Sequence, residues 1–103
     1  MRARLKVTVI RKLSWKEMFS EQLPYVSKSV TEYCDRWDEG HEFIVEEDGK
    51  MPEGFCTWAW ADIWPIICTL RFGGNLPWLE KEGLSYSCCT DAVRPVLFKI
   101  ERI

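Results

Sequence analysis

Apolar and polar side chains alternate over the first dozen residues of the chain. Leu5, Val7 and Val9 are apolar, and the residues between them carry a basic or a hydroxyl group. Because successive side chains of a β-strand point to opposite faces of the sheet, this alternation predicts a half-buried strand over residues 4–12. Its aliphatic face would belong to the core, and its basic face would contact solvent.

The same two-residue period returns close to the end of the sequence. Val96, Phe98 and Ile100 fall on one side of it, which predicts a final strand with a charged outer face. Two shorter runs, 43–46 and 85–89, are rich in strand-forming residues. The pattern therefore predicts strands at both ends of the chain and at two places between them.

A helical period replaces the alternation in two places. In the first, Trp15, Met18 and Phe19 form an apolar stripe, and Ser14 is a suitable N-cap residue before them. Proline lacks the N–H group that would continue the helical hydrogen bonds, so Pro24 is expected to break this helix. The first helix is therefore expected to be short.

The second helix is predicted in the most aromatic part of the chain. Residues 55–78 hold four of the six tryptophans. Thr57 is a candidate N-cap for a helix that runs to about residue 72, and the pair Gly73–Gly74 would supply the left-handed stop. Pro65 conflicts with a regular helix, so the helix either kinks there or begins later, with Pro65 in its first turn.

These elements define the expected fold. Their order is β-α-β-α-β-β, which indicates an α+β protein with a small, mainly antiparallel sheet packed against the tryptophan-rich helix. At 103 residues, with 47% hydrophobic and 29% charged residues, the chain is expected to form a single domain over residues 1–103.

Charge is unevenly distributed, although the formal net charge is only −2. Residues 2–16 carry six basic side chains and no acidic one, whereas residues 32–53 carry nine acidic side chains and two basic ones. Two solvated faces that attract each other within the fold or across an oligomer explain this distribution, and a docking face for a charged partner is the alternative. The small net charge gives no reason to expect nucleic acid as a partner.

The sequence predicts a cytoplasmic protein that does not span a membrane. The apolar run of residues 55–70 contains Asp62 and is too short to cross a bilayer. The basic N-terminal stretch does not have the pattern of a signal peptide. Five cysteines, with Cys88 and Cys89 adjacent, fit a reducing compartment better than a disulfide framework.

Four blocks of sequence together resemble a family. They are P-E-G-F-C-T-W-A-W-A-D-I, L-R-F-G-G-N-L-P-W, C-C-T-D and R-P-V-L-F-K-I-E-R-I, in this order. In these blocks the chain is similar to an uncharacterised family of short proteins from mostly anaerobic bacteria and archaea. The resemblance implies a loop with cysteines and prolines over residues 27–38, where this chain has only Cys34. It implies a self-contained domain, and it names no activity or substrate.

Thiol chemistry is one candidate activity. Cys56 directly precedes the predicted helix N-terminus, where the helix dipole and free amide groups favour a thiolate. His41 is the only histidine and therefore the only candidate imidazole base, and Asp62 or Asp91 would orient it. The alternative is that the cysteines are buried as small hydrophobic residues.

A metal site is the weaker chemical alternative. The sequence has no C-x-x-C or H-x-x-x-H pair, and adjacent cysteines chelate a tetrahedral ion poorly. Only ligands distant in the sequence would form a site, and the candidates are Cys34, His41, Cys56 and Cys88. We therefore predict no metal and no cofactor.

A pocket for a small molecule is the leading functional hypothesis, in a binding protein or a small enzyme. A helix that is apolar nearly all round must be covered from several sides, by the sheet and by a ligand or a second subunit. The helix also contains charged residues, which serve either a ligand or an ion pair such as Asp62 with Arg94 or Arg102. The candidate ligand-binding residues are Cys56, Trp58, Trp60, Asp62, Arg71, Trp78, Cys88 and Asp91.

An interaction module is the alternative from a different class. Tryptophan is a favoured anchor at protein interfaces, and symmetric homo-oligomers are the common result of self-association. Trp15, Trp37 and Trp78 lie outside the central helix and are candidates for such a surface. In this interpretation the protein is a homo-oligomer without catalytic activity.

Overall fold

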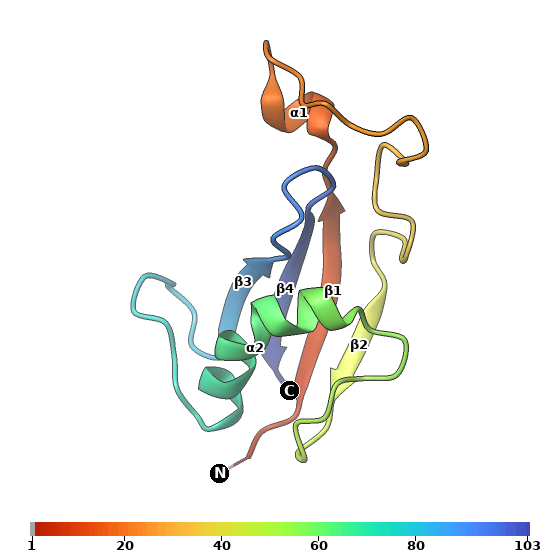
Figure 1. The fold of residues 1–103 in the computed structure, drawn as a ribbon. Coiled ribbons are helices and arrows are strands. Elements are labelled where there is room, and N and C mark those ends of the chain that lie inside the picture. Colours follow the sequence, from red (N-terminus) through yellow and green to blue (C-terminus); the bar gives the residue numbers. More distant parts are fainter. Residues whose placement is uncertain (1) are drawn as a thin grey trace.

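The computed structural model of the protein describes residues 2–103 and confirms the α+β fold class (Figure 1). The elements are β1 (Leu5–Lys12), α1 (Trp15–Phe19), β2 (Glu42–Val45), α2 (Thr57–Arg71), β3 (Leu84–Cys88) and β4 (Val96–Arg102). The strands form one antiparallel four-stranded sheet in the order β2-β1-β4-β3. The order of elements along the chain is the predicted one, and α2 lies across one face of the sheet.

The two central strands, β1 and β4, form the floor of the hydrophobic core. Their alternating residues Val7 and Val9 pair with Ile100 and Phe98, and all four side chains are fully buried. Fully burying a side chain of this size contributes about 1.5–3 kcal/mol relative to leaving it in water. The sequence alternation therefore selects the sheet face that α2 covers.

Helix α2 supplies the other half of the core. Ile63, Ile67 and Leu70 recur at helical spacing, and all three are fully buried in the same cluster as the sheet residues. The opposite face of the sheet carries charged pairs such as Lys6 with Glu42, whose Nζ and Oε2 atoms lie 3.6 Å apart. Within residues 2–103 no helix has the length and apolarity needed to cross a bilayer.

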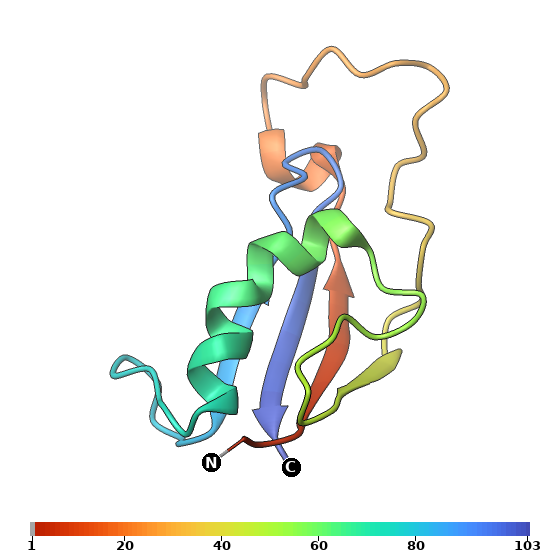
Figure 2. The same ribbon diagram turned by 60° about the horizontal axis from the view of Figure 1, so that its bottom comes forward.

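The helix continues through Pro65 and does not begin after it. Figure 2 shows that α2 changes direction about half way along its length. Pro65 has no N–H group for the carbonyl of Ala61, and such a missing bond is a common cause of a bent helix. Gly73, with a φ of 86°, then provides the predicted left-handed stop, and the N–H of Gly74 bonds to the carbonyl of Thr69 at 2.8 Å.

The N-cap of α2 is Cys56, so the prediction of Thr57 was wrong by one residue. Cys56 has an extended backbone, with φ −81° and ψ 126°. Its carbonyl already accepts the first helical hydrogen bond, from the N–H of Trp60 at 2.8 Å. Thr57 is therefore the first helical residue, and the thiol of Cys56 occupies the end of the helix.

Trp37 lies in the core, although it belongs to a segment without regular secondary structure. Its ring centroid is 5.3 Å from that of Phe43, 5.0 Å from that of Phe55 and 5.9 Å from that of Phe98. The side chain is only 9% exposed, and its Nε1–H donates to the carbonyl of Gly54 at 3.2 Å. Trp37 is therefore not available as an interface residue, which corrects that part of the oligomer hypothesis.

Candidate functional site

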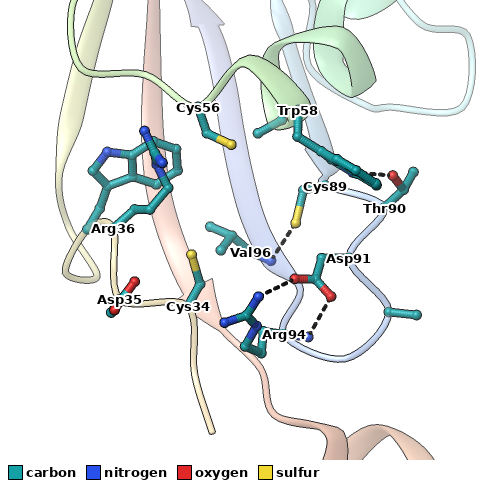
Figure 3. A pocket seen from close by; sticks show the side chains of 13 residues that line it. Cys34, Asp35, Arg36, Cys56, Trp58, Cys89, Thr90, Asp91, Arg94 and Val96 are labelled. Carbon is teal, nitrogen blue, oxygen red and sulfur yellow. Dashed lines mark hydrogen bonds and ion pairs between the residues drawn. The ribbon is translucent and has the colours of Figure 1, made fainter. Parts of the chain in front are cut away.

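A pocket of about 570 Å³ opens at the N-terminal end of α2. Three segments that are distant in the sequence form its walls: residues 34–37 before β2, the start of α2, and the connection from β3 to β4 (Figure 3). The lining residues are Cys34, Asp35, Arg36, Trp37, Cys56, Trp58, Ala59, Cys89, Thr90, Asp91, Ala92, Arg94 and Val96. A volume of this size accommodates a small organic molecule.

Trp58 is an aromatic side chain on the pocket wall that is both exposed and fixed. Its exposed fraction is 64%, yet its Nε1–H donates to the hydroxyl of Thr90 at 2.7 Å. That hydroxyl donates in turn to Asp62, with its oxygen 3.0 Å from Oδ2, and the N–H of Thr90 donates to the same carboxylate oxygen at 2.7 Å. The chain Trp58–Thr90–Asp62 therefore connects α2 to the β3–β4 connection and holds the indole in place.

The β3–β4 connection also presents a charged pair. The Oδ1 atom of Asp91 accepts hydrogen bonds from the backbone N–H groups of Val93 and Arg94, at 3.1 and 3.2 Å. Its Oδ2 atom lies 3.3 Å from the Nη2 atom of Arg94. The Nη1 atom of Arg94 is 3.5 Å from the hydroxyl of Thr31. A guanidinium group has five N–H donors, so these two long contacts leave capacity for a ligand.

Cys34, Cys56 and Cys89 bring three thiols to the same pocket. Figure 3 shows their sulfur atoms directed toward the space between the walls. The Sγ atom of Cys89 accepts a hydrogen bond from the N–H of Val96 at 3.3 Å. Burial raises the pKa of the Cys89 thiol, and the backbone hydrogen bonds to its sulfur offset part of that effect. At neutral pH Cys89 therefore holds its proton.

Three of the eight predicted ligand-binding residues line this pocket: Cys56, Trp58 and Asp91. Asp62 does not line the pocket itself, but it accepts hydrogen bonds from Thr90, which does. In the described range 2–103 it forms no ion pair with Arg94 or Arg102, so that predicted pairing was wrong. Arg94 pairs with Asp91, and Arg102 donates to the carbonyl of Leu70 at 3.1 Å.

The remaining predicted ligand-binding residues lie elsewhere. Trp60 packs against the core, with its ring centroid 5.7 Å from that of Phe55. Trp78 is 73% exposed in the segment after α2, and Cys88 is exposed at the end of β3. Neither side chain lines the pocket. Of the adjacent residues Cys88 and Cys89, it is Cys89 that lines it.

Arg71 has a structural position at the other end of α2. It is 6% exposed, and its Nη2 atom donates to the carbonyl of Glu47 at 2.6 Å. Its guanidinium carbon lies 5.0 Å from the ring centroid of Phe72. The side chain fixes the end of the helix on the turn that follows β2, and it is not part of the pocket.

The predicted catalytic set Cys56, His41 and Asp62 is not assembled. The ring of His41 is stacked on Phe43, with centroids 4.5 Å apart, and it does not line the pocket that holds Cys56. The four metal candidates are likewise divided, because Cys34 and Cys56 line the pocket, whereas His41 and Cys88 lie outside it. Over residues 2–103 no group of three or more His, Cys, Asp or Glu side chains is arranged to hold a metal ion.

The sequence did not place Cys89, Thr90 or Arg94 in the ligand site, and it named Arg94 only as an ion-pair partner for Asp62. One signal was available, because Cys88 and Cys89 must point to opposite faces of a strand and only one of them can face the helix. The contribution of Thr90 and Arg94 depends on how the β3–β4 connection folds over α2.

Comparison of the chain with models of protein families, with curated proteins and with solved structures gives no match in any of the three. The family resemblance therefore stays a prediction, and the candidate function has to come from the site.

Proposed function

We propose that the protein binds a small molecule that has an aromatic body and a carboxylate group, in the pocket beside Trp58. The observation that supports this most strongly is the state of Trp58, whose indole is 64% exposed and fixed by a hydrogen bond of 2.7 Å to Thr90. Folding alone gains little from holding an exposed ring. A fixed and exposed aromatic ring is, in contrast, what a stacking ligand needs, because the protein has already lost the side-chain entropy.

The opposite wall supplies the polar part of the recognition. Within residues 2–103 the guanidinium of Arg94 has polar contacts only to Asp91 and Thr31, at 3.3 and 3.5 Å. Its planar shape matches the two oxygens of a carboxylate. Asp91 accepts hydrogen bonds from the backbone N–H groups of Val93 and Arg94, so its charge is already compensated in part. A ligand with one apolar end and one anionic end therefore suits both walls.

Ligand-detected NMR with benzoate and with its neutral analogue benzamide tests this proposal. We expect the wild-type protein to saturate benzoate more strongly than benzamide. Because one aromatic contact contributes about 0.5–1.5 kcal/mol, Trp58→Ala should weaken benzoate binding by about two- to tenfold. Arg94→Gln should remove the preference for benzoate over benzamide.

Trp64→Ala is the matched control for Trp58→Ala. Trp64 is a second exposed tryptophan on α2, it stacks on Trp60 with centroids 5.5 Å apart, and it does not line the pocket. We expect this variant to bind benzoate like the wild type. An equal loss in the two variants, or no saturation transfer to benzoate in the wild type, would contradict the proposal.

Self-association is the second candidate function, and one observation favours it. Trp78 and Phe72 are 73% and 58% exposed, and both belong to the segment around the C-terminal end of α2. Large apolar side chains exposed close together in sequence are candidates for an interface. This surface lies outside the pocket, so the two functions are separable by mutation.

A further inference from the structure

Three of the five cysteines line one pocket, although they come from separate parts of the chain. Cys34 belongs to the segment before β2, Cys56 is the N-cap of α2, and Cys89 follows β3. Each is only partly buried against the core, so packing leaves part of each residue accessible. The adjacent Cys88 is exposed and does not line the pocket, and it provides an internal comparison.

Cys56 is the thiol best placed to attack. Its side chain forms no capping hydrogen bond, and the first turn of the 15-residue helix α2 contains no acidic residue. The thiol therefore lies at the positive end of the helix dipole, and no side chain in the first turn of the helix offsets that field. Figure 3 shows the sulfur of Cys56 beside Trp58 on the pocket wall.

Cys34 and Cys89 differ in how firmly they are held. Cys89 directly follows β3, its sulfur accepts the N–H of Val96, and burial raises its pKa, so it stays protonated and fixed. Cys34 belongs to a connection without regular secondary structure, and its carbonyl accepts a hydrogen bond from Lys12 at 3.2 Å. Cys89 would have to give up the hydrogen bond from Val96 before it attacked, so Cys34 is the better candidate for the second thiol.

We propose that this pocket performs thiol–disulfide exchange with a small disulfide that carries an aromatic body and a carboxylate. The Cys56 thiolate attacks one sulfur of the disulfide, which forms a mixed disulfide and releases one small thiolate. Cys34 then gives its proton to solvent and attacks the Cys56 sulfur, which releases the second small thiolate and leaves a Cys34–Cys56 disulfide. The small disulfide is reduced by two electrons, and the two cysteines are oxidised by two.

The substrate class follows from the walls that flank Cys56. This inference rests on the proposed function, because Trp58 and Arg94 would hold the aromatic and carboxylate parts of the disulfide. The probe is dithiobis(nitrobenzoate), an aromatic disulfide with two carboxylates whose released thiolate is coloured. Its neutral counterpart is dipyridyl disulfide.

Stopped-flow absorbance of the fully reduced, oxygen-free protein measures the exchange. We expect Cys56 to react with dithiobis(nitrobenzoate) about tenfold or more faster than the exposed Cys88, because Trp58 and Arg94 would hold the probe beside Cys56, whereas Cys88 meets it only by free collision. Cys56→Ser should remove the fast phase, and Cys88→Ser should keep it. Arg94→Gln should slow the reaction with the anionic probe more than the reaction with dipyridyl disulfide.

Mass spectrometry of the products tests the role of the second thiol. The wild type should accumulate a Cys34–Cys56 disulfide, whereas Cys34→Ser should retain a stable mixed disulfide at Cys56. A Cys56 rate no higher than that of Cys88, or an internal disulfide that still forms in Cys34→Ser, would overturn the inference. Cys56→Ala with native circular dichroism serves as the second variant if Cys56→Ser folds poorly.

Failure of the exchange is distinguishable from failure of the pocket itself. Benzoate binding by Cys56→Ser reports on the pocket, because that variant keeps Trp58 and Arg94 and lacks the attacking sulfur. If it binds benzoate while wild-type Cys56 reacts slowly, the proposed function stands and the exchange inference falls. If benzoate does not bind to the wild type, the proposed function falls with it.

Discussion

At the scale of single residues, the hydroxyl of Thr90 accepts a hydrogen bond from Trp58 and donates one to Asp62. A hydroxyl can do both at once because it carries one hydrogen and two lone pairs. The sequence suggested a direct role for Asp62, in a ligand site or an ion pair. In the structure the carboxylate of Asp62 instead holds Thr90 in place, and Thr90 orients Trp58.

Thr90→Val tests this relay, because valine keeps the shape of threonine and removes the hydroxyl. We expect the Nε1–H of Trp58 to exchange faster with deuterium, and benzoate to bind several-fold more weakly. The variant loses the hydrogen bond from Trp58 and the one to Asp62, and each loss costs about 0.5–1.5 kcal/mol of unfolding free energy. Hydrogen exchange by NMR and urea unfolding measure the two effects.

Thr69→Val is the matched control for that change. Within the described residues the hydroxyl of Thr69 makes a single hydrogen bond, to the carbonyl of Pro65 in the same helix at 2.8 Å, and it lies outside the pocket. Its loss should leave the exchange of the Trp58 Nε1–H and the affinity for benzoate as in the wild type. If Thr69→Val disturbed Trp58 as much as Thr90→Val, the relay would not be specific.

At the scale of elements, α2 is fixed at its two ends by different means. Its N-terminal end faces the pocket, whereas its C-terminal end is attached through Arg71 to the turn after β2. Gly49 in that turn has a φ of 73°, and the N–H of Gly49 bonds to the carbonyl of Glu46 at 2.9 Å. A Cβ atom at Gly49 would overlap the guanidinium group of Arg71.

Gly49→Ala should therefore destabilise the protein through two effects, the strained φ and the overlap with Arg71. Gly54→Ala is the control, because Gly54 has a φ of 82° and open space where its Cβ would lie. Both variants therefore carry a similar backbone strain, which costs about 1–3 kcal/mol. We expect Gly49→Ala to lose more unfolding free energy than Gly54→Ala in urea titrations, and equal losses would mean that Arg71 moves freely.

At the scale of the whole molecule, the pocket and the exposed aromatic residues after α2 are separate surfaces. The asymmetric charges of the sequence are partly paired within the fold, as in the contact of 2.7 Å between Arg4 and Glu46. The hydrogen bond and the attraction to Glu46 raise the pKa of Arg4. This supports the interpretation of two faces that attract each other within one chain.

Self-association is the prediction that belongs to this scale. Sedimentation velocity at micromolar concentration should show a mass above that of a single chain, and Trp78→Ala should shift the population toward the monomer, because a central tryptophan often dominates an interface. Trp64→Ala provides a comparison at an exposed tryptophan that stacks on Trp60. A wild type that sediments only as a monomer would contradict the oligomer hypothesis and leave the pocket proposal unaffected.

The sequence by itself determined the elements and the faces that they bury. The alternation around Val7 and the helical spacing of Ile63 and Ile67 are local patterns, and burying apolar area is a strong driving force, so each pattern selects one face. The stop at Gly73 is local as well, since a positive φ favours glycine. These are the features that the structure confirms.

Only the tertiary structure decided the composition of the site. Cys34, Cys56 and Cys89 lie far apart in the sequence, and they line one pocket because two segments pack against the start of α2. Trp37 anchors the segment of Cys34 in the core, and Thr90 attaches the β3–β4 connection to α2. Trp37 is buried in this way even though its neighbours in the sequence are charged. Contacts of this kind depend on long-range packing, which no local period encodes, so the sequence could name Cys56, Trp58 and Asp91 but not the residues that face them.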